Sequence, residues 1–125
     1  MIVANDDHIA RLRSGVPAWN AWRRDHDDMT PDLRAASLRG LDLSGADLTH
    51  ADLRDCDLRG AILRSARLVG ARLDGANMFK AVLADADLQD AVLVNARFLD
   101  CAQIVTARNW RSTRRDPSLD CETIA

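Results

Sequence analysis

The sequence predicts an all-β fold in which residues 31–105 wind into a square coil, a β-helix. Residues repeat with a period of five, as in "ADLTHADLRDCDLRGAILRS" at 46–65, with an apolar centre and a turn-forming corner in each repeat. On an α-helix five residues turn through about 500°, so the leucines would spread around the whole surface. On a straight strand an odd period sends successive leucines to opposite faces. The pattern therefore predicts short extended pieces separated by corners, and four corners close a square.

The interior of this coil is predicted to be filled by one large and one small residue from each repeat. The centre positions are Leu33, Leu38, Leu43, Leu48, Leu53, Leu58, Leu63, Leu68, Leu73, Met78, Leu83, Leu88, Leu93 and Phe98. Two residues before each centre lies a second inward position, because side chains two apart in an extended segment share a face. It holds alanine in most repeats, with Pro31, Leu41 and Cys56 as the exceptions. This regularity predicts a dry core.

The corner positions hold residue types that tolerate tight turns. Gly40, Gly45, Gly60, Gly70 and Gly75 occupy corners in the first part of the coil, and several later corners are Asp or Asn. The repeat pattern, the turn chemistry and the packing thus agree on one structure.

A helical N-terminal cap is expected over residues 1–30. Asp6 or Asp7 is the expected N-cap of a first helix that ends near Gly15. Pro17 favours the start of a second helix, on which Trp19 and Trp22 lie three apart. Because the open end of a stacked coil exposes leucines and unpaired backbone, we expect these tryptophans to plug it.

A short C-terminal cap and tail are expected over residues 106–125, since the register fails at Gln103, where an inward centre would otherwise fall. Trp110 is the expected apolar anchor of this segment. The same segment carries four arginines against three acidic residues, which is too weak a bias to predict nucleic-acid binding.

Over residues 31–100 the chain resembles the pentapeptide-repeat family, whose members repeat A(D/N)LXX, and fourteen repeats follow without a gap. The resemblance implies a right-handed quadrilateral parallel β-helix of about three and a half coils, because twenty residues make one coil. The stretch "GVPAWNAWR" also resembles the helical segment that precedes the repeats in many bacterial members.

The composition is that of a soluble, single-domain protein, with 125 residues, 47% apolar content and a net charge of −2. The apolar runs are too short to span a membrane, and no leader segment is evident, so a cytoplasmic location is expected. Cys56, Cys101 and Cys121 are odd in number and lack metal-ligand spacing. We expect small, buried or incidental thiols rather than a disulfide framework or a zinc site.

No catalytic, cofactor-binding or metal-binding residues are expected. His8, His26 and His50 have no ligand or triad spacing among them. The many aspartates point outward on an open face, which supplies neither a cleft nor a raised pKa for acid–base work. The chain is therefore not expected to be an enzyme or to bind a small-molecule substrate.

The outward charges bear on one activity that the resemblance implies. Some family members mimic duplex DNA and bind type II topoisomerases such as DNA gyrase, which gives quinolone resistance. Residues 31–105 hold eleven aspartates, no glutamate and nine basic residues, and the columns alternate in sign, as in Asp47, Arg67 and Asp87. A surface whose charges alternate in sign does not reproduce the continuous row of negative phosphates in DNA. Topoisomerase inhibition is therefore the alternative function rather than the favoured one.

The favoured function is protein interaction, because the outward positions turn apolar towards the end of the coil. The residues expected to form a protein interface are Phe79, Leu99, Val82, Ile62, Val92 and Val94. The dimeric family members that the chain resembles associate through their C-terminal coils, so a homodimer is the simplest partner to expect. An open alternative is that the C-terminal segment, with Trp110, folds back over this patch.

Overall fold

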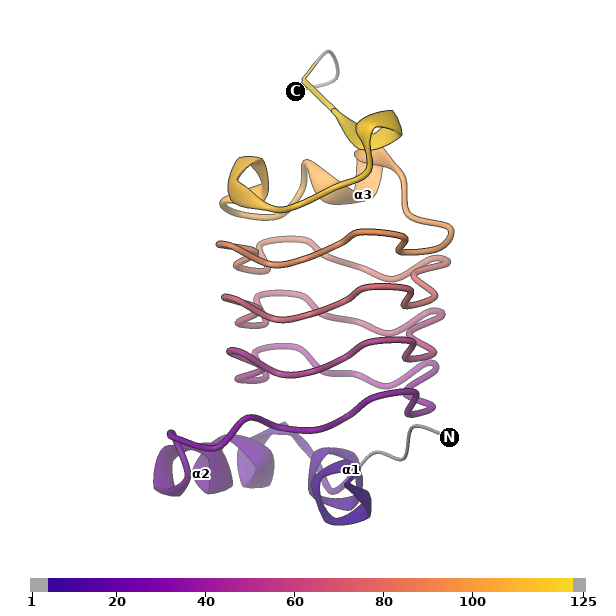
Figure 1. The fold of residues 1–125 in the computed structure, drawn as a ribbon. Helices are drawn as coiled ribbons and strands as arrows, with labels where there is room; N and C mark the ends of the chain where they lie inside the picture. Colours follow the sequence, from indigo (N-terminus) through magenta and orange to yellow (C-terminus); the bar gives the residue numbers. More distant parts are fainter. Residues whose placement is uncertain (1–4, 123–125) are drawn as a thin grey trace.

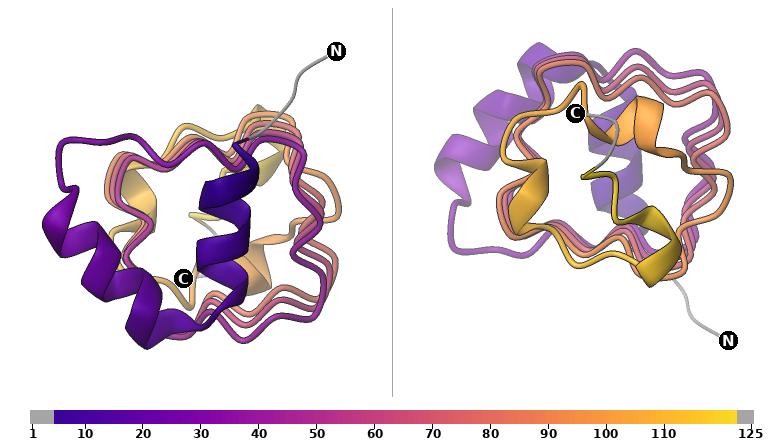
Figure 2. Two further views of the ribbon diagram at one scale, coloured as in Figure 1. Left: turned by 90° about the horizontal axis from the view of Figure 1, so that it is seen from below. Right: turned by 90° about the horizontal axis from the view of Figure 1, so that it is seen from above.

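The computed structural model describes residues 5–122, which form a rod of stacked square coils between helical segments at both ends (Figures 1 and 2). The ends of the two expected caps, residues 1–4 and 123–125, lie outside the described residues. Parallel bridges join residues twenty positions apart, from Asp32 with Asp52 to Asn77 with Arg97. Among the described residues these bridges are isolated rather than part of longer strands.

Each bridge and each corner rests on the same backbone hydrogen bonds. The amide of Asp52 donates to the carbonyl of Pro31 at 2.9 Å, and the amide of Leu33 donates to the carbonyl of Asp52 at 2.9 Å. At the corner that follows, the amide of Ala36 donates back to the carbonyl of Leu33 at 3.1 Å, and Ala35 takes a left-handed φ of 58°. A left-handed residue every fifth position turns the chain through each corner.

The interior holds the predicted leucines and alanines. Every predicted centre from Leu33 to Leu93 is buried, with at most 2% of its surface exposed. Cys56 is also buried, and its thiol lies 2.8 Å from the carbonyl oxygen of Leu33. The predicted register is therefore confirmed over these repeats.

Helices α1 (Asp6–Arg13) and α2 (Val16–Asp25) lie across the N-terminal end of the rod (Figures 1 and 2). The N-cap of α1 is Asn5, whose side chain accepts from the amide of His8, so the expectation of Asp6 or Asp7 as N-cap was wrong by one or two positions. Both aspartates lie in the first turn, where acidic residues stabilise a helix by interacting with the positive end of its dipole. Trp19 is fully buried.

These helices satisfy backbone groups that the open end of the coil would leave unpaired. The amide of Asp32 donates to Nδ1 of His8 at 3.0 Å, and the amide of Asp47 donates to Oδ1 of Asn20 at 2.8 Å. The side chain of Arg13 donates to the carbonyl of Ser37. An exposed edge of this kind otherwise templates pairing with another chain.

The C-terminal segment first leaves the coil and then resumes its pairing. Helix α3 (Cys101–Ile104) begins where the repeat ends, and a capping box joins Asp100 and Gln103. Arg108 then bridges with Asp87 and Arg114 with Val92, at spacings longer than the regular twenty. The 3₁₀ helices η1 (Trp110–Ser112) and η2 (Pro117–Leu119) follow. The segment therefore continues the stack with longer corners.

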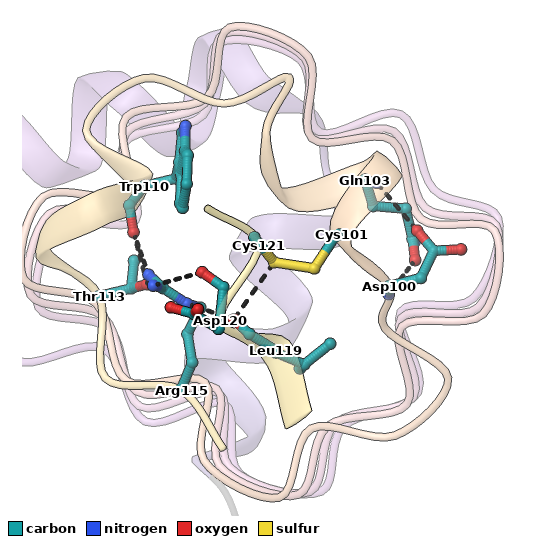
Figure 3. The surroundings of a disulfide bond; sticks show 9 residues. All are labelled: Asp100, Cys101, Gln103, Trp110, Thr113, Arg115, Leu119, Asp120 and Cys121. Carbon is teal, nitrogen blue, oxygen red and sulfur yellow. Dashed lines mark hydrogen bonds between the residues drawn. A yellow bond between two sulfur atoms is a disulfide. The ribbon is translucent and has the colours of Figure 1, made fainter. Parts of the chain in front are cut away.

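Cys101 and Cys121 form a disulfide bond across this end of the rod, which corrects the expectation of incidental thiols (Figure 3). The two cysteines are twenty residues apart, which is the length of one regular coil, but both lie outside the repeats: Cys101 begins α3 and Cys121 follows η2. Arg115 holds the returning tail with bonds to the carbonyls of Trp110 and Leu119. Disulfide bonds persist mainly in oxidising compartments, so this bond does not favour the expected cytoplasmic location.

Candidate interaction surface

Two phenylalanine rings lie exposed and in contact on one side of the rod. Phe79 has 47% and Phe98 has 66% of its surface exposed. Their ring centroids are 5.9 Å apart and the rings meet edge to face at 75°. Leucine and alanine side chains fill the interior, and neither ring contributes to it. Exposing two adjacent aromatic rings to water is therefore a feature that core packing does not explain.

Phe98 reaches the surface because the chain turns two residues early in the last repeat, at position 98 instead of 100. Arg97 still pairs with Asn77, but Phe98 itself takes the left-handed corner conformation, with φ of 57°. Leu99 then enters the interior and is 8% exposed. The predictions for these two neighbours were therefore interchanged: Phe98 was expected inside, and Leu99 was expected in the interface. The early turn places Asp100 where its side chain caps α3.

Basic side chains surround the two rings on this second side of the square, which comprises residues 36–40, 56–60, 76–80 and 96–100. Lys80 places Nζ 5.4 Å from the centroid of the Phe79 ring, within the range of a cation–π interaction. Phe79 and Lys80 line a shallow hollow of about 320 Å³ together with Arg39, Arg59 and Gly60. Arg97 lies beside Phe98 in sequence and is exposed. We call this surface the basic–aromatic face.

Only part of this positive charge is neutralised on the face itself. Arg59 donates to both carboxylate oxygens of Asp57, at 2.8 and 2.7 Å, and these bonds lower the pKa of Asp57 to about 2. Within residues 5–122, no carboxylate lies at ion-pair distance from Arg39, Lys80 or Arg97. The face is therefore apolar at its centre and positive around it.

The remaining residues of the expected interface are half-buried on the adjoining sides. Ile62 and Val82 are bridged neighbours on the third side, and Val82 borders a shallow hollow of about 300 Å³ beside α3. Val92 on the first side is bridged to Arg114 of the C-terminal segment. Next to Val94, the amide of Asn95 donates to the carboxylate of Asp116. The structure thus keeps Phe79 with Ile62 and Val82 around one corner, while Val92 pairs through its backbone with the C-terminal segment.

Trp110 does not cover the basic–aromatic face. It is 5% exposed and packs on the end of the rod between the guanidinium groups of Arg111 and Arg115, at 4.4 and 5.1 Å from its ring. Arg111 and Arg115 of the tail therefore make contacts within the C-terminal segment itself, and Figure 3 shows those of Arg115. The alternative in which the tail folds back along the side to cover Phe79 is wrong.

The charges on the first side are matched within single coils rather than between coils. Arg54 bonds Asp52 at 2.7 Å and Arg34 bonds Asp32 at 2.9 Å, whereas the contact from Arg34 up to Asp52 spans 3.8 Å. The hydrogen bond from Arg34 lowers the pKa of the Asp32 carboxyl. Burial opposes such a shift at Asp52, but the hydrogen bonds from Arg54 still hold the pKa of Asp52 below its ordinary value. These carboxylates do not form a free acidic face.

Nothing in the described part of the chain indicates a reaction centre. Residues 5–122 contain no group of three or more His, Cys, Asp or Glu side chains that could hold a metal ion. Burial raises the pKa of the Cys56 thiol to about 12, which keeps it protonated and unreactive. In the same residues, no helix has the length and apolarity to cross a membrane.

The sequence model of the pentapeptide repeats matches residues 32–101 with eight copies, which is more than half of the chain. The chain belongs to the pentapeptide-repeat family. Members of this family form right-handed β-helices, in agreement with the stacked coils and parallel bridges described above. No curated protein matches the chain in sequence.

Similar solved structures are pentapeptide-repeat proteins from plants and cyanobacteria. A protein of the Arabidopsis thaliana thylakoid lumen is 29% identical, with 52% of each chain covered and a TM-score of 0.45. A protein from the cyanobacterium Cyanothece 51142 is 29% identical, with 73% of this chain and 65% of that chain covered and a TM-score of 0.37. HetL from Nostoc sp. strain PCC 7120, a protein involved in heterocyst differentiation regulation, is 30% identical, with coverages of 66% and 37% and a TM-score of 0.35. This chain spans less than two thirds of each of these structures.

Proposed function

We propose that this pentapeptide-repeat chain is a non-enzymatic module that binds another protein through the surface around Phe79, with another copy of the chain as the simplest partner. The observation that carries the proposal is the pair of exposed rings, Phe79 and Phe98, which lie on the outside of a coil whose core is filled by other side chains. Exposed aromatic residues flanked by arginine are typical of the centres of protein interfaces.

In this proposal the segments at the two ends of the rod are caps that prevent strand pairing at the open coils. The helical segment at the N-terminus and the disulfide-closed segment at the C-terminus keep a coil of about three and a half turns from pairing end to end with other chains. The sides of the rod and the outer surfaces of its caps then remain for a partner. Ile62 and Val82 extend the proposed contact around the corner from Phe79.

The alternative, DNA mimicry directed at DNA gyrase or another type II topoisomerase, has less support. It requires a continuous row of unpaired carboxylates, whereas Asp32, Asp52 and Asp57 are bonded to neighbouring arginines. A supercoiling assay in the presence of a quinolone tests it directly. Protection of the topoisomerase by the parent protein, retained in Phe79→Glu, would favour the alternative.

The experiment that tests the favoured function compares three proteins as bait and in solution: the parent, Phe79→Glu and Arg64→Glu. Arg64 is exposed on the third side and has no ion-pair partner among residues 5–122, so it is the matched control for an added carboxylate. We expect Phe79→Glu to lose self-association in light scattering, or to lose a defined protein that both the parent and Arg64→Glu retain. Equal behaviour of all three proteins in both measurements contradicts the proposal.

A further inference from the structure

We propose that a second copy of the chain occupies the basic–aromatic face, and that it does so with the acidic loop formed by residues 25–29. This inference rests on the proposed function, because it names the partner of the same surface. It also specifies the geometry, since the contact joins two different surfaces of the two copies.

The acidic loop, "DHDDM", starts at Asp25, the last residue of α2, and presents an apolar side chain among carboxylates. Met29 is 40% exposed, and Asp25, Asp27 and Asp28 are exposed around it. Within the described part of the chain, none of these three carboxylates has an ion-pair partner.

The loop is held in one conformation from behind. The buried side chain of Arg23 donates from Nη1 to the carbonyls of His26 at 3.3 Å and Met29 at 2.7 Å. The amide of Met29 closes the turn by donating to the carbonyl of His26 at 3.1 Å. A loop that is already ordered loses less conformational entropy on binding, so Met29 can bind a partner without a change in the loop conformation.

The loop and the basic–aromatic face are complementary in both charge and apolar content. Among residues 5–122, the exposed large apolar side chains are Met29, Phe79 and Phe98. One of them lies among unpaired carboxylates, and the other two lie among the unpaired cations Arg39, Lys80 and Arg97. A thioether against aromatic rings is a favourable contact, and the opposite charges around it would attract.

The two surfaces of one molecule do not reach each other. Arg23 also donates from Nη2 to the carbonyl of Thr49 at 3.1 Å, which fixes the loop beside the fourth side of the first coil. Phe79 lies two coils further on, on the opposite second side, at about 10 Å along the axis from the stacking of strands alone. The contact is therefore between molecules and head to tail.

A symmetric dimer through the basic–aromatic face is less favourable. In such a dimer the same patch meets itself. Arg39, Lys80 and Arg97 of one copy would then approach the same cations of the other, and like charges across an interface cost binding free energy. The acidic loop offers the same face an apolar side chain without this repulsion.

Sedimentation velocity over a wide concentration range tests the contact with two charge-reversed variants. The first variant, Asp27→Arg with Asp28→Arg, has a basic loop and a basic face. The second, Arg39→Glu with Lys80→Glu, has an acidic loop and an acidic face. We expect the parent to self-associate and each variant alone to associate at least tenfold more weakly. An equimolar mixture of the two variants should associate again, because each loop then finds a face of opposite charge.

The parent's average mass should keep rising with concentration instead of levelling at a dimer, since a head-to-tail contact leaves both surfaces unused at the ends. High salt should weaken the association. Arg64→Glu is the control and should behave as the parent does. Circular dichroism of every variant checks that the fold is intact.

The remaining outcomes separate this inference from the proposed function. A parent that stays monomeric at every concentration overturns the inference, while a Phe79-dependent heterologous partner would still support the function. Association that is lost in Phe79→Glu but unchanged in Asp27→Arg with Asp28→Arg also overturns the inference and retains Phe79 as a contact. Association that is unchanged in Phe79→Glu overturns both.

Discussion

The indole N–H of Trp19 donates to the backbone carbonyl of Asp47, with 2.8 Å between Nε1 and the oxygen. This bond lets one side chain fill the open end of the coil and also satisfy a polar group of its unpaired edge. Trp19→Phe keeps most of the apolar volume but leaves the carbonyl of Asp47 unsatisfied. We expect a loss of about 1–3 kcal/mol in the free energy of unfolding, measured by urea denaturation.

The matched control for this substitution is Trp22→Phe. Trp22 is only partly buried and lies between His8 of α1 and His26, with ring centroids 5.1 and 4.9 Å away. The structure gives its indole no hydrogen bond, so the control should lose less than Trp19→Phe. A larger loss for Trp22→Phe would contradict the described role of Trp19.

The register of the coil predicts opposite outcomes for two adjacent residues. Leu63 is fully buried at a centre position, and Arg64 is exposed immediately after it. Leu63→Asp places an unpaired carboxylate in the core and should destabilise the protein by several kcal/mol or prevent folding. Arg64→Asp should change the free energy of unfolding by less than about 0.5 kcal/mol. Similar melting temperatures for the two variants would refute the register.

The stability of the N-terminal end should depend on the protonation of His8. Burial lowers the pKa of His8, and its Nδ1 accepts a hydrogen bond from the amide of Asp32, so the neutral ring is the folded form. The folded-state pKa lies below the unfolded value of 6.5, so the unfolded chain binds the proton more readily. Stability is therefore fully present above pH 6.5 and decreases as the pH falls towards the folded-state pKa.

Urea denaturation of the parent and of His8→Gln between pH 7.5 and pH 5 measures this dependence. The glutamine variant does not titrate there, so the difference between the two proteins isolates the contribution of His8. Parallel pH profiles would show that His8 is not the titrating group. The carboxylates, whose pKa values lie lower, contribute only at more acidic pH.

The cysteines give a chemical test of the C-terminal end. A non-reducing peptide digest should link Cys101 to Cys121, and native protein should leave Cys56 unmodified by alkylating reagents until it is unfolded. Cys121→Ser opens a loop with a sequence separation of 20 and should cost roughly 3 kcal/mol by the chain-entropy estimate. A link involving Cys56, or rapid alkylation of Cys56 in the folded protein, would contradict the structure.

Two corner glycines should differ although both have a left-handed backbone. A Cβ atom on Gly70 would clash with Nδ1 of His50 in the coil below, whereas one on Gly40 would meet open space. Both alanine variants carry the backbone strain of a positive φ, about 1 kcal/mol. Gly70→Ala must also displace the imidazole, so its melting temperature should fall further than that of Gly40→Ala. The reverse order would show that His50 does not occupy this position.

The regular part of the fold could be predicted because the residues within each repeat determine its conformation locally. A centre leucine, a small residue two positions earlier and a corner residue define the path of the chain locally, and residues from Leu33 to Leu93 follow it. The early turn at Phe98 could not be read in this way. It depends on the capping of α3 by Asp100 and Gln103, which the repeat pattern does not encode.

The candidate surface was predicted only in part, for two reasons. Arg39, Arg59 and Phe79 are twenty residues apart and therefore stack in one outward column. The interface was predicted from the apolar residues alone, so the positive charge around Phe79 was missed. The acidic loop was missed because it was assigned to the helical cap, and nothing in the sequence shows that Arg23 orders it from behind. The signal available in the sequence was that charged residues adjoin the apolar ones, with Asp28 before Met29 and Lys80 after Phe79.

Because each coil pairs only with the coils directly above and below it, the repeat acts as a molecular ruler. A twenty-residue cassette inserted at a corner of the central coils would find the same neighbours as the residues it displaces. The rod would lengthen by about 4.8 Å per cassette, the spacing of paired strands. Both ends would keep their own contacts, so the separation between the N-terminal loop and the aromatic rings can change in fixed steps without redesign of either one.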